Sequence, residues 1–286
     1  MSAPYTLDRA LAFARLRFES RTHVIEEGRR ASFADLDEET TRRARELVAR
    51  GLARGGKVAL RLSNSFHHLA AALAVWRAGG VLVPVNPRLT EEEEETICER
   101  AGVSLRACLD DGGTLLAEER SGDAPADAEL AAIAYTSGTT GLPKGVEITH
   151  SNMLWSAAAV VHTRRDRDRA VAAMVSPICH LPVFVSHYLA RLLSGGTVVA
   201  GAFDADRLFS LLADHGITDL PLVPAMVAPL LDRGSLPSGL GLRKVTVGSA
   251  LTPMETKLAL AERFPQAEIV EAYGQTESTD GLTMTV

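Results

Sequence analysis

A short run of hydroxyl, glycine and lysine residues near the middle of the chain has the composition of a phosphate site. The run extends from Tyr135 to Gly145 and reads Tyr-Thr-Ser-Gly-Thr-Thr-Gly-Leu-Pro-Lys-Gly. Glycines let the backbone approach an anion closely, and successive backbone N–H groups can surround phosphate oxygens. The hydroxyl groups add hydrogen-bond donors, and Lys144 adds a positive charge. We therefore expect this run to bind the phosphates of a nucleotide.

The run differs from the phosphate loop of P-loop NTPases. That loop reads Gly-x-x-x-x-Gly-Lys-Ser/Thr and opens directly into a helix. Here Pro143 precedes Lys144, Gly145 follows it, and the next residues, Val146–Thr149, are strand-like. A plain surface turn is the simpler alternative, but so long a run of these residue types in this order is rare in turns. We favour phosphate binding.

A second run near the end of the chain offers complementary chemistry. It reads Glu271-Ala-Tyr-Gly-Gln-Thr-Glu-Ser278 and follows the strand-like Glu268–Val270, at a place where α/β sheets commonly bind ligands. Tyr273 offers a ring to stack on a base, Thr276 a hydroxyl for a phosphate, and Glu277 an oxygen ligand suited to Mg²⁺. Alone, the run is as typical of a turn as of a site. About 130 residues after a phosphate loop, it indicates the second half of a nucleotide site.

The two runs resemble the signatures of the acyl-adenylate-forming (AMP-binding) superfamily. That group includes acyl- and aryl-CoA synthetases, luciferases and the adenylation domains of non-ribosomal peptide synthetases. The resemblance extends from about Leu7 to Thr279 and includes Arg77–Pro87, a fold element in the family. The chain looks most like the N-terminal large-domain portion of acyl- and aryl-CoA synthetases.

The resemblance implies a role for each residue of the two runs. The loop would embrace the β- and γ-phosphates of ATP, Tyr273 would stack on adenine, and Thr276 would contact the α-phosphate. Glu277 would coordinate Mg²⁺, and the expected catalytic residues are Lys144, Thr276 and Glu277. The expected ATP site consists of Thr136, Ser137, Gly138, Thr139, Thr140, Gly141, Lys144, Gly248, Ser249, Ala250, Glu271, Ala272, Tyr273, Gly274 and Thr276.

Two segments between the runs resemble the family's adenine and acyl pocket walls. Val247–Leu251 stands where the family has a Gly-Gly-Ala-Pro-like turn, but Ser249 replaces a glycine and Leu251 a proline. Ser176-Pro-Ile-Cys-His180 resembles a Pro-x-x-His stretch beside the carboxylate pocket, and both a pocket role and a structural role stay open for His180. The expected acid pocket consists of His180, Val183, Phe184 and Gly248.

The substrate class is suggested by two apolar segments. Leu181–Tyr188 and Val223–Leu231 are largely apolar, and neither contains an acidic residue that would pair with the ammonium group of an amino acid. Because apolar pockets suit acyl or aryl groups, we expect a fatty or aromatic acid.

Short strand-like runs alternate with longer amphipathic helical runs along the chain. Thr90 is expected to cap a helix that starts with the solvated glutamates Glu91–Glu95, and Arg164–Arg169 is expected to form a solvent-facing turn. The other expected helices are Leu36–Arg50, Phe66–Arg77, Ser151–Val161 and Asp206–His215. The expected strands are Lys57–Leu62, Val81–Val85, Ala131–Tyr135, Val146–Thr149, Ala170–Val175, Gly196–Ala200, Asp219–Val223, Lys244–Gly248 and Glu268–Glu271.

This alternation predicts mostly parallel sheets with helices on both faces. We expect two stacked α/β subdomains of an adenylate-forming large domain, with the family's C-terminal domain absent. The first would span residues 1–128, including a loop or linker over 112–128. The second would span residues 129–286 and carry both nucleotide-binding runs.

Composition excludes several classes of protein. The chain has 286 residues, 46% of them hydrophobic, and a net charge of −6, which argues against phosphate-driven nucleic-acid binding and a basic membrane anchor. The paired His67 and His68 lack metal-protease spacing. The three cysteines, Cys98, Cys108 and Cys179, include no Cys-x-x-Cys. These cysteines predict free thiols in a reducing compartment. The N-terminus is unlike a secretory signal, and no apolar run is long enough to span a bilayer. We therefore expect a cytoplasmic protein.

The resemblance implies a two-step reaction. A carboxylic acid would attack ATP to give an acyl-adenylate and pyrophosphate, and a thiol, usually that of coenzyme A, would then displace AMP. In the family, a ribose-binding aspartate, a hinge and a small domain with a catalytic lysine follow the second run, and none lies before Val286. Three interpretations stay open: a fragment of a full synthetase, a partner of a separate C-terminal piece, and a non-catalytic module that binds nucleotide or acyl-adenylate.

Overall fold

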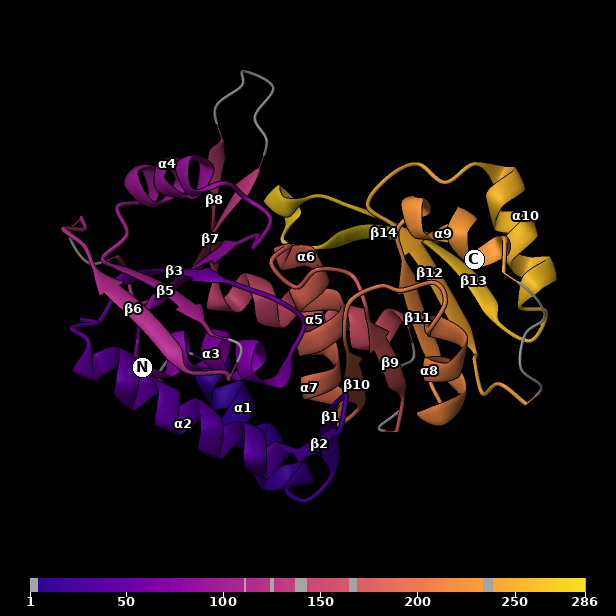
Figure 1. Cartoon of the computed structure of the whole chain (residues 1–286), viewed down its shortest axis with the longest axis horizontal. Coiled ribbons are helices and arrows are strands. Elements are labelled where there is room, and N and C mark those ends of the chain that lie inside the picture. Colours follow the sequence, from indigo (N-terminus) through magenta and orange to yellow (C-terminus); the bar gives the residue numbers. More distant parts are fainter. Residues whose placement is uncertain are drawn as a thin grey trace.

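The protein contains two twisted sheets separated by a layer of helices (Figure 1). The computed structural model describes residues 5–110, 112–123, 126–136, 143–164, 169–233 and 239–285. The six-stranded sheet has the order β6-β5-β3-β4-β7-β8. Its strands are β3 (Lys57–Arg61), β4 (Val81–Val85), β5 (Leu105–Leu109), β6 (Leu115–Glu119), β7 (Leu130–Thr136) and β8 (Lys144–Thr149). The edge strands β6 and β8 run antiparallel to their neighbours, and the other four are parallel.

The eight-stranded sheet has the order β14-β13-β12-β11-β9-β10-β1-β2. Its strands are β1 (Thr22–Glu26), β2 (Arg29–Ser32), β9 (Val171–Met174), β10 (Thr197–Ala200), β11 (Asp219–Leu222), β12 (Lys244–Gly248), β13 (Glu268–Gly274) and β14 (Gly281–Thr285). Antiparallel pairs again occur at the edges, where β2 meets β1 and β14 meets β13. Two mostly parallel sheets confirm the predicted α/β class.

Helices cover both faces of each sheet. The helices are α1 (Leu7–Phe18), α2 (Phe33–Ala49), α3 (Phe66–Arg77), α4 (Glu91–Ala101), α5 (His150–Thr163), α6 (Leu181–Val183), the π-helix η1 (Phe184–Leu189), α7 (Ala190–Ser194), α8 (Leu208–Asp214), α9 (Pro224–Leu231), α10 (Met254–Arg263) and the 3₁₀ turn η2 (Thr276–Ser278). A strand sends alternate side chains to opposite faces. In β3, accordingly, Val58 and Leu60 join the core between the sheets, and Ala59 packs in the outer core with α4.

The central core joins the two halves of the molecule. It contains Leu11 of α1, Leu60 of β3, Ala132 of β7 and Val198 of β10 in one continuous cluster. A second cluster lies where α8, α9 and α10 cover the outer face of the eight-stranded sheet. In Figure 1, α5 and α7 accordingly lie between the two sheets.

A single amide side chain links the two sheets by hydrogen bonds. Asn64 follows β3, and its Nδ2 lies 2.9–3.0 Å from the carbonyl oxygens of Met174, Ser176 and Gly201. Its Oδ1 accepts a hydrogen bond from the Ile178 N–H at 3.0 Å. The carboxyl ends of β9 and β10 are therefore held against the carboxyl end of β3.

Two expectations about chain organisation differ from the structure. The expected linker over 112–128 contains β6, which pairs with β5 from Leu105↔Glu119 to Leu109↔Leu115. The strands also do not divide between the two sheets at the expected subdomain boundary between residues 128 and 129. The hairpin β1–β2 lies in the eight-stranded sheet beside β10, and the hairpin β7–β8 lies in the six-stranded sheet beside β4. Pairing between strands that are far apart in the sequence decides which sheet each strand joins. Local sequence patterns do not encode this pairing.

The glutamate run at the start of α4 is only partly solvated. Thr90 and Glu93 form the expected capping box, but Glu94 is fully buried between Arg61 and Arg106. Arg61 Nε donates to Glu94 at 2.7 Å, and Arg106 Nε does so at 3.0 Å. Burial alone would raise the pKa of Glu94, but the two arginines outweigh that effect and lower the pKa.

Other sequence predictions are confirmed. The helix Phe66–Arg77 and the strands Val81–Val85 and Lys244–Gly248 have the expected bounds. The three cysteines are free thiols. Within the residues that the structure describes, no helix is long and apolar enough to cross a membrane.

We predict that Glu94→Gln destabilises the protein by about 2 kcal/mol or more. The substitution leaves two arginines around a neutral amide. Breaking a fully buried pair costs about 3–5 kcal/mol, and here both guanidinium groups keep some contact with solvent. Urea unfolding measures the change. Glu92→Gln, at an exposed position of the same run, should change stability by about 0.5 kcal/mol at most, and equal effects of the two substitutions would contradict the assignment.

Candidate functional site

A cavity of about 560 Å³ brings the two predicted runs together. Its walls come from β7, the end of α5, the segment before α6, η1, the ends of β11 and β12, and the turn after β13. Ten of the predicted site residues line it: Thr136, His180, Val183, Gly248, Ser249, Ala272, Tyr273, Gly274, Thr276 and Glu277.

Two glycines on the cavity wall stand where no side chain fits. A Cβ on Gly248 would lie 2.7 Å from the Ala272 carbonyl oxygen, because β12 and β13 pair there. A Cβ on Gly274 would lie 2.4 Å from the Asp280 carbonyl oxygen, where the chain folds back into β14. Ser249 adopts a φ of +72°, a left-handed conformation that favours glycine. The serine at this position therefore adopts a backbone conformation in which a glycine would be less strained.

The turn after β13 presents polar groups to the cavity. Tyr273, at the end of β13, is 61% exposed, so most of its side chain is accessible to a ligand. Thr276 and Glu277 begin the 3₁₀ turn η2, and Glu277 is exposed. The Ser278 hydroxyl closes the turn, with Oγ 2.8 Å from the Gln275 carbonyl oxygen and 2.7 Å from that of Asp280.

The phosphate-loop prediction falls on the connection between β7 and β8. These strands pair antiparallel, and Thr136 stands opposite Lys144. Thr136 lines the cavity, whereas Lys144 is exposed beside it and does not line it. Ser137, Gly138, Thr139, Thr140 and Gly141 lie outside the described residues.

Three other predicted residues do not line the cavity. Glu271 binds Lys257 of α10 at 2.8 Å, and this hydrogen bond lowers the pKa of its carboxyl group. Ala250 is exposed just beyond the cavity wall. Phe184 is fully buried in the central core, with its ring centroid 5.7 Å from that of Trp76. Its neighbour Val183 takes the pocket position.

The π-helix η1 contributes residues that the sequence analysis missed. Ser186 and His187 lie three and four residues after the predicted Val183 of α6 and line the cavity with it, whereas Phe184 and Tyr188 face the core. The surrounding protein lowers the pKa of His187 well below its ordinary value, by burial first and then by nearby arginine charges. The sequence shows the three- and four-residue spacing of these side chains. It does not show which face of η1 meets the cavity.

Arg164 is the most unexpected part of the wall. The sequence predicted that it faces solvent, but it is only 8% exposed and lines the cavity. Its Nη1 donates to the Ser186 carbonyl oxygen at 3.2 Å and lies 3.4 Å from His187 Nδ1. Its own carbonyl oxygen accepts a hydrogen bond from Lys244 Nζ at 2.5 Å. These contacts hold the charged side chain inside the protein.

A buried carboxyl group lies behind this wall. Burial raises the pKa of Asp280 from 3.8 to about 6, against the opposing effects of the Arg164 charge, the Gly281 N–H and the Ser186 hydroxyl. No hydrogen-bond partner lies within reach of its buried Oδ2 among the described residues. The side chain therefore changes charge near neutral pH.

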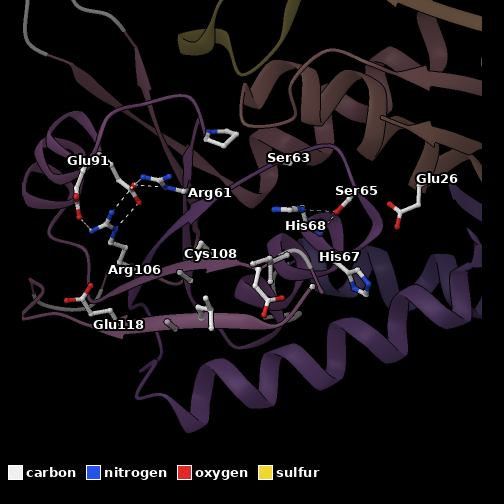
Figure 2. A pocket seen from close by; sticks show the side chains of 18 residues that line it. Glu26, Arg61, Ser63, Ser65, His67, His68, Glu91, Arg106, Cys108 and Glu118 are labelled. Atoms are coloured by element: carbon white, nitrogen blue, oxygen red, sulfur yellow. Dashed lines mark hydrogen bonds and ion pairs between the residues drawn. The ribbon is translucent and has the colours of Figure 1, made fainter. Parts of the chain in front are cut away.

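A second cavity, of about 900 Å³, opens at the carboxyl ends of β3 and β5 (Figure 2). Seven of its 18 lining residues are charged, and Arg61 and Arg106 converge there on Glu94. It contains none of the predicted site residues. Although it is larger, we assign the functional site to the smaller cavity, where residues from both predicted runs meet.

Comparisons with known proteins identify the family of the chain. A family model described as AMP-binding enzyme matches residues 12–285. The chain is similar to 4-coumarate–CoA ligase 5 of Oryza sativa subsp. japonica, with 30% identity over 298 residues that cover 90% of this chain and 54% of the ligase. It is also similar to phosphinothricin tripeptide synthetase PhsB of Streptomyces viridochromogenes, with 30% identity over 284 residues that cover 90% of this chain and 24% of the synthetase.

Solved structures show the same fold. The N-terminal domain of FACL13 from Mycobacterium tuberculosis matches with a TM-score of 0.85 over 98% of this chain and 78% of that chain, at 23% identity. The chain thus spans about half the length of the rice ligase and about a quarter of the peptide synthetase.

We predict that Asp280→Asn changes how stability depends on pH. Because the pKa of Asp280 is raised in the folded state, its contribution to stability is present below about pH 4 and is lost as the pH rises through about 6. The asparagine variant should therefore gain stability relative to wild type between pH 4 and 7.5, by on the order of 3 kcal/mol.

Urea unfolding over this pH range measures the gain. Asp214→Asn, at an exposed position on α8, controls for the loss of one carboxylate at the surface. Parallel pH profiles for wild type and Asp280→Asn would rule out a buried titrating carboxyl group at this position.

Proposed function

The chain belongs to the AMP-binding enzyme family, and we propose that it binds ATP in the smaller cavity and activates a carboxylic acid as an acyl-adenylate. This proposal rests on one observation: Thr136, Tyr273, Thr276 and Glu277 all line the same cavity. These residues come from different sheets and from runs about 130 residues apart. Their types suit the phosphates, the base and the metal of one nucleotide.

Each residue has a task in this reaction. Tyr273 stacks on adenine, and Thr276 orients the α-phosphate through its hydroxyl group. A carboxylate oxygen of the acid forms a bond to the α-phosphorus, while the bond from that phosphorus to the α,β-bridging oxygen breaks and pyrophosphate leaves. Such a step depends mainly on positioning and charge neutralisation. Lys144, cross-strand from Thr136, neutralises the leaving pyrophosphate.

Glu277 is suited to hold Mg²⁺. Magnesium is usually bound in such sites by one or two carboxylates together with substrate phosphates and water, and Glu277 supplies an exposed carboxylate on the cavity wall. The ion would neutralise phosphate charge. No cluster of three or more metal-binding side chains occurs in the described part of the chain.

The sulfur of a thiol, in this proposal that of coenzyme A in the cytoplasm, then forms a bond to the acyl carbon, while the bond from that carbon to the phosphate oxygen breaks and AMP leaves. The relatives support this acceptor, because one of them is a CoA ligase.

The chain spans about half of that ligase, so a second candidate function is a module that binds ATP or acyl-adenylate and needs a further domain for turnover. ATP–pyrophosphate exchange driven by an acid tests for turnover, and nucleotide binding without exchange favours the second candidate.

We predict that Lys144→Ala weakens ATP binding about tenfold or more and changes AMP binding much less. A charge-assisted contact is worth about 1.5–3 kcal/mol, and Lys144 should contact the phosphates that AMP lacks. Glu277→Gln should weaken ATP binding only when Mg²⁺ is present. Isothermal titration with ATP and AMP, with and without Mg²⁺, measures these changes.

Two matched variants serve as controls. Glu147→Gln lies on β8 beyond Lys144, and Glu262→Gln lies on α10, both at exposed positions. Neither should alter nucleotide affinity. Unchanged ATP affinity in both Lys144→Ala and Glu277→Gln would overturn the proposed site.

A further inference from the structure

The 3₁₀ turn η2 carries two of the proposed site residues, Thr276 and Glu277, and both line the smaller cavity. Within the described part of the chain, neither of these side chains makes a hydrogen bond or an ion pair. The places of the hydroxyl group and the carboxylate therefore depend on the backbone of the turn.

This backbone is strained directly after η2. Thr279 follows the turn with a φ of +72°, a conformation that a β-branched residue rarely adopts. The Thr279 side chain is buried. A conformation of this kind persists only where the surrounding contacts over-determine it, and it is found most often at functional sites. The contacts around Thr279 therefore show what holds the turn.

One hydroxyl group connects the two arms of the turn. Ser278 Oγ lies 2.8 Å from the carbonyl oxygen of Gln275, before the turn, and 2.7 Å from that of Asp280, after it. The Gln275 N–H also donates to this hydroxyl oxygen, at 3.3 Å. The backbone N–H groups of Ser278 and Thr279 reach only the carbonyl groups of Gln275 and Thr276. The Ser278 hydroxyl thus links the chain before η2 to Asp280.

The Asp280 carbonyl group is itself packed against β13. A Cβ on Gly274 would lie 2.4 Å from this oxygen, and the Asp280 residue is buried. The pairing of β13 with β14 shifts register between Tyr273 and Gly274, so regular strand pairing ends below the turn. Asp280 therefore offers the Ser278 hydroxyl a partner whose place is fixed by packing.

Ser278 does not line the cavity, so it can act on a ligand only through the turn. We propose that Ser278 is a positioning residue, whose hydroxyl group holds the strained turn where Thr276 meets the α-phosphate and Glu277 meets Mg²⁺. The inference rests on the proposed function and adds a residue to it. Adenine stacking does not depend on Ser278, because Tyr273 lies on β13 before the register shift.

Isothermal titration of Ser278→Ala with two ligands tests this inference. Adenosine reports on binding of the base, and Mg-ATP adds the phosphates and the metal. Without the hydroxyl group the turn can leave its strained conformation, so Mg-ATP should bind about fivefold more weakly or worse, as the loss of one hydrogen bond allows. Adenosine affinity should stay unchanged, which also shows that the variant folds. An equal loss for both ligands, or no loss for either, overturns the inference.

Two further substitutions serve as comparisons. Ser210→Ala removes a hydroxyl group of α8 that likewise donates to a carbonyl oxygen three residues earlier, that of Arg207, at 2.8 Å. It should change neither affinity. Ser278→Thr keeps a hydroxyl group and should keep most of the Mg-ATP affinity. If Ser278→Thr binds Mg-ATP as weakly as Ser278→Ala does, the hydroxyl group is not the determinant and the inference fails.

A double-mutant cycle separates positioning from general support of the cavity. In the Thr276→Ala/Glu277→Gln variant the turn no longer presents either group, so adding Ser278→Ala should leave ATP affinity unchanged. Residues that act through the same contact are not additive. A further loss as large as that in the wild-type background would contradict the positioning role.

The titrations of wild type separate this inference from the proposed function. Wild type that binds Mg-ATP, with an affinity that Ser278→Ala does not change, retains the proposed function and loses the positioning role. Wild type that binds neither adenosine nor Mg-ATP loses the nucleotide site and this inference with it.

Discussion

The side-chain amide of Asn64 joins the two sheets where the candidate site forms. The site needs Thr136 from the six-stranded sheet and Tyr273, Thr276 and Glu277 from the eight-stranded sheet. Hydrophobic packing across the central helices is non-directional and sets no register by itself. Asn64 contacts three carbonyl groups and one N–H group at the ends of β9 and β10. These directional bonds hold the carboxyl end of β3 against the ends of β9 and β10, and one of their partners, Ser176, lines the cavity.

The resulting cavity combines two kinds of chemistry. At Gly248 and Gly274 the backbone packs too closely for a side chain, and an exposed tyrosine ring lies beside them. Farther along β12, the wall changes to a buried arginine, a histidine and hydroxyl groups. The first part contains the residues that we propose to bind the nucleotide. The second part is lined by Arg164, Ser186 and His187, which come from the end of α5 and from η1.

The sequence predicted local features well. The residue types of Tyr135–Gly145 and Glu271–Ser278 indicated phosphate and base chemistry, and apolar periodicity located α3, β4 and β12 with their observed bounds. Capping chemistry at Thr90 is equally local and was also confirmed. The roles of the individual site residues stay predictions.

Features that depend on distant partners could not be predicted. Glu94 looked solvated, because its partners lie on β3 and β5. Arg164 looked exposed within a charged run, because its contacts are with η1 and β12. The face of η1 that meets the cavity, and the exchange of hairpins between the sheets, also depend on tertiary packing.

Hydrogen–deuterium exchange with and without Mg-ATP tests most directly whether the smaller cavity is a nucleotide site. We expect slower exchange in two separate segments together, residues 136–149 and residues 271–281. Slower exchange in one of them alone, or instead at residues 105–118 beside the larger cavity, would contradict it.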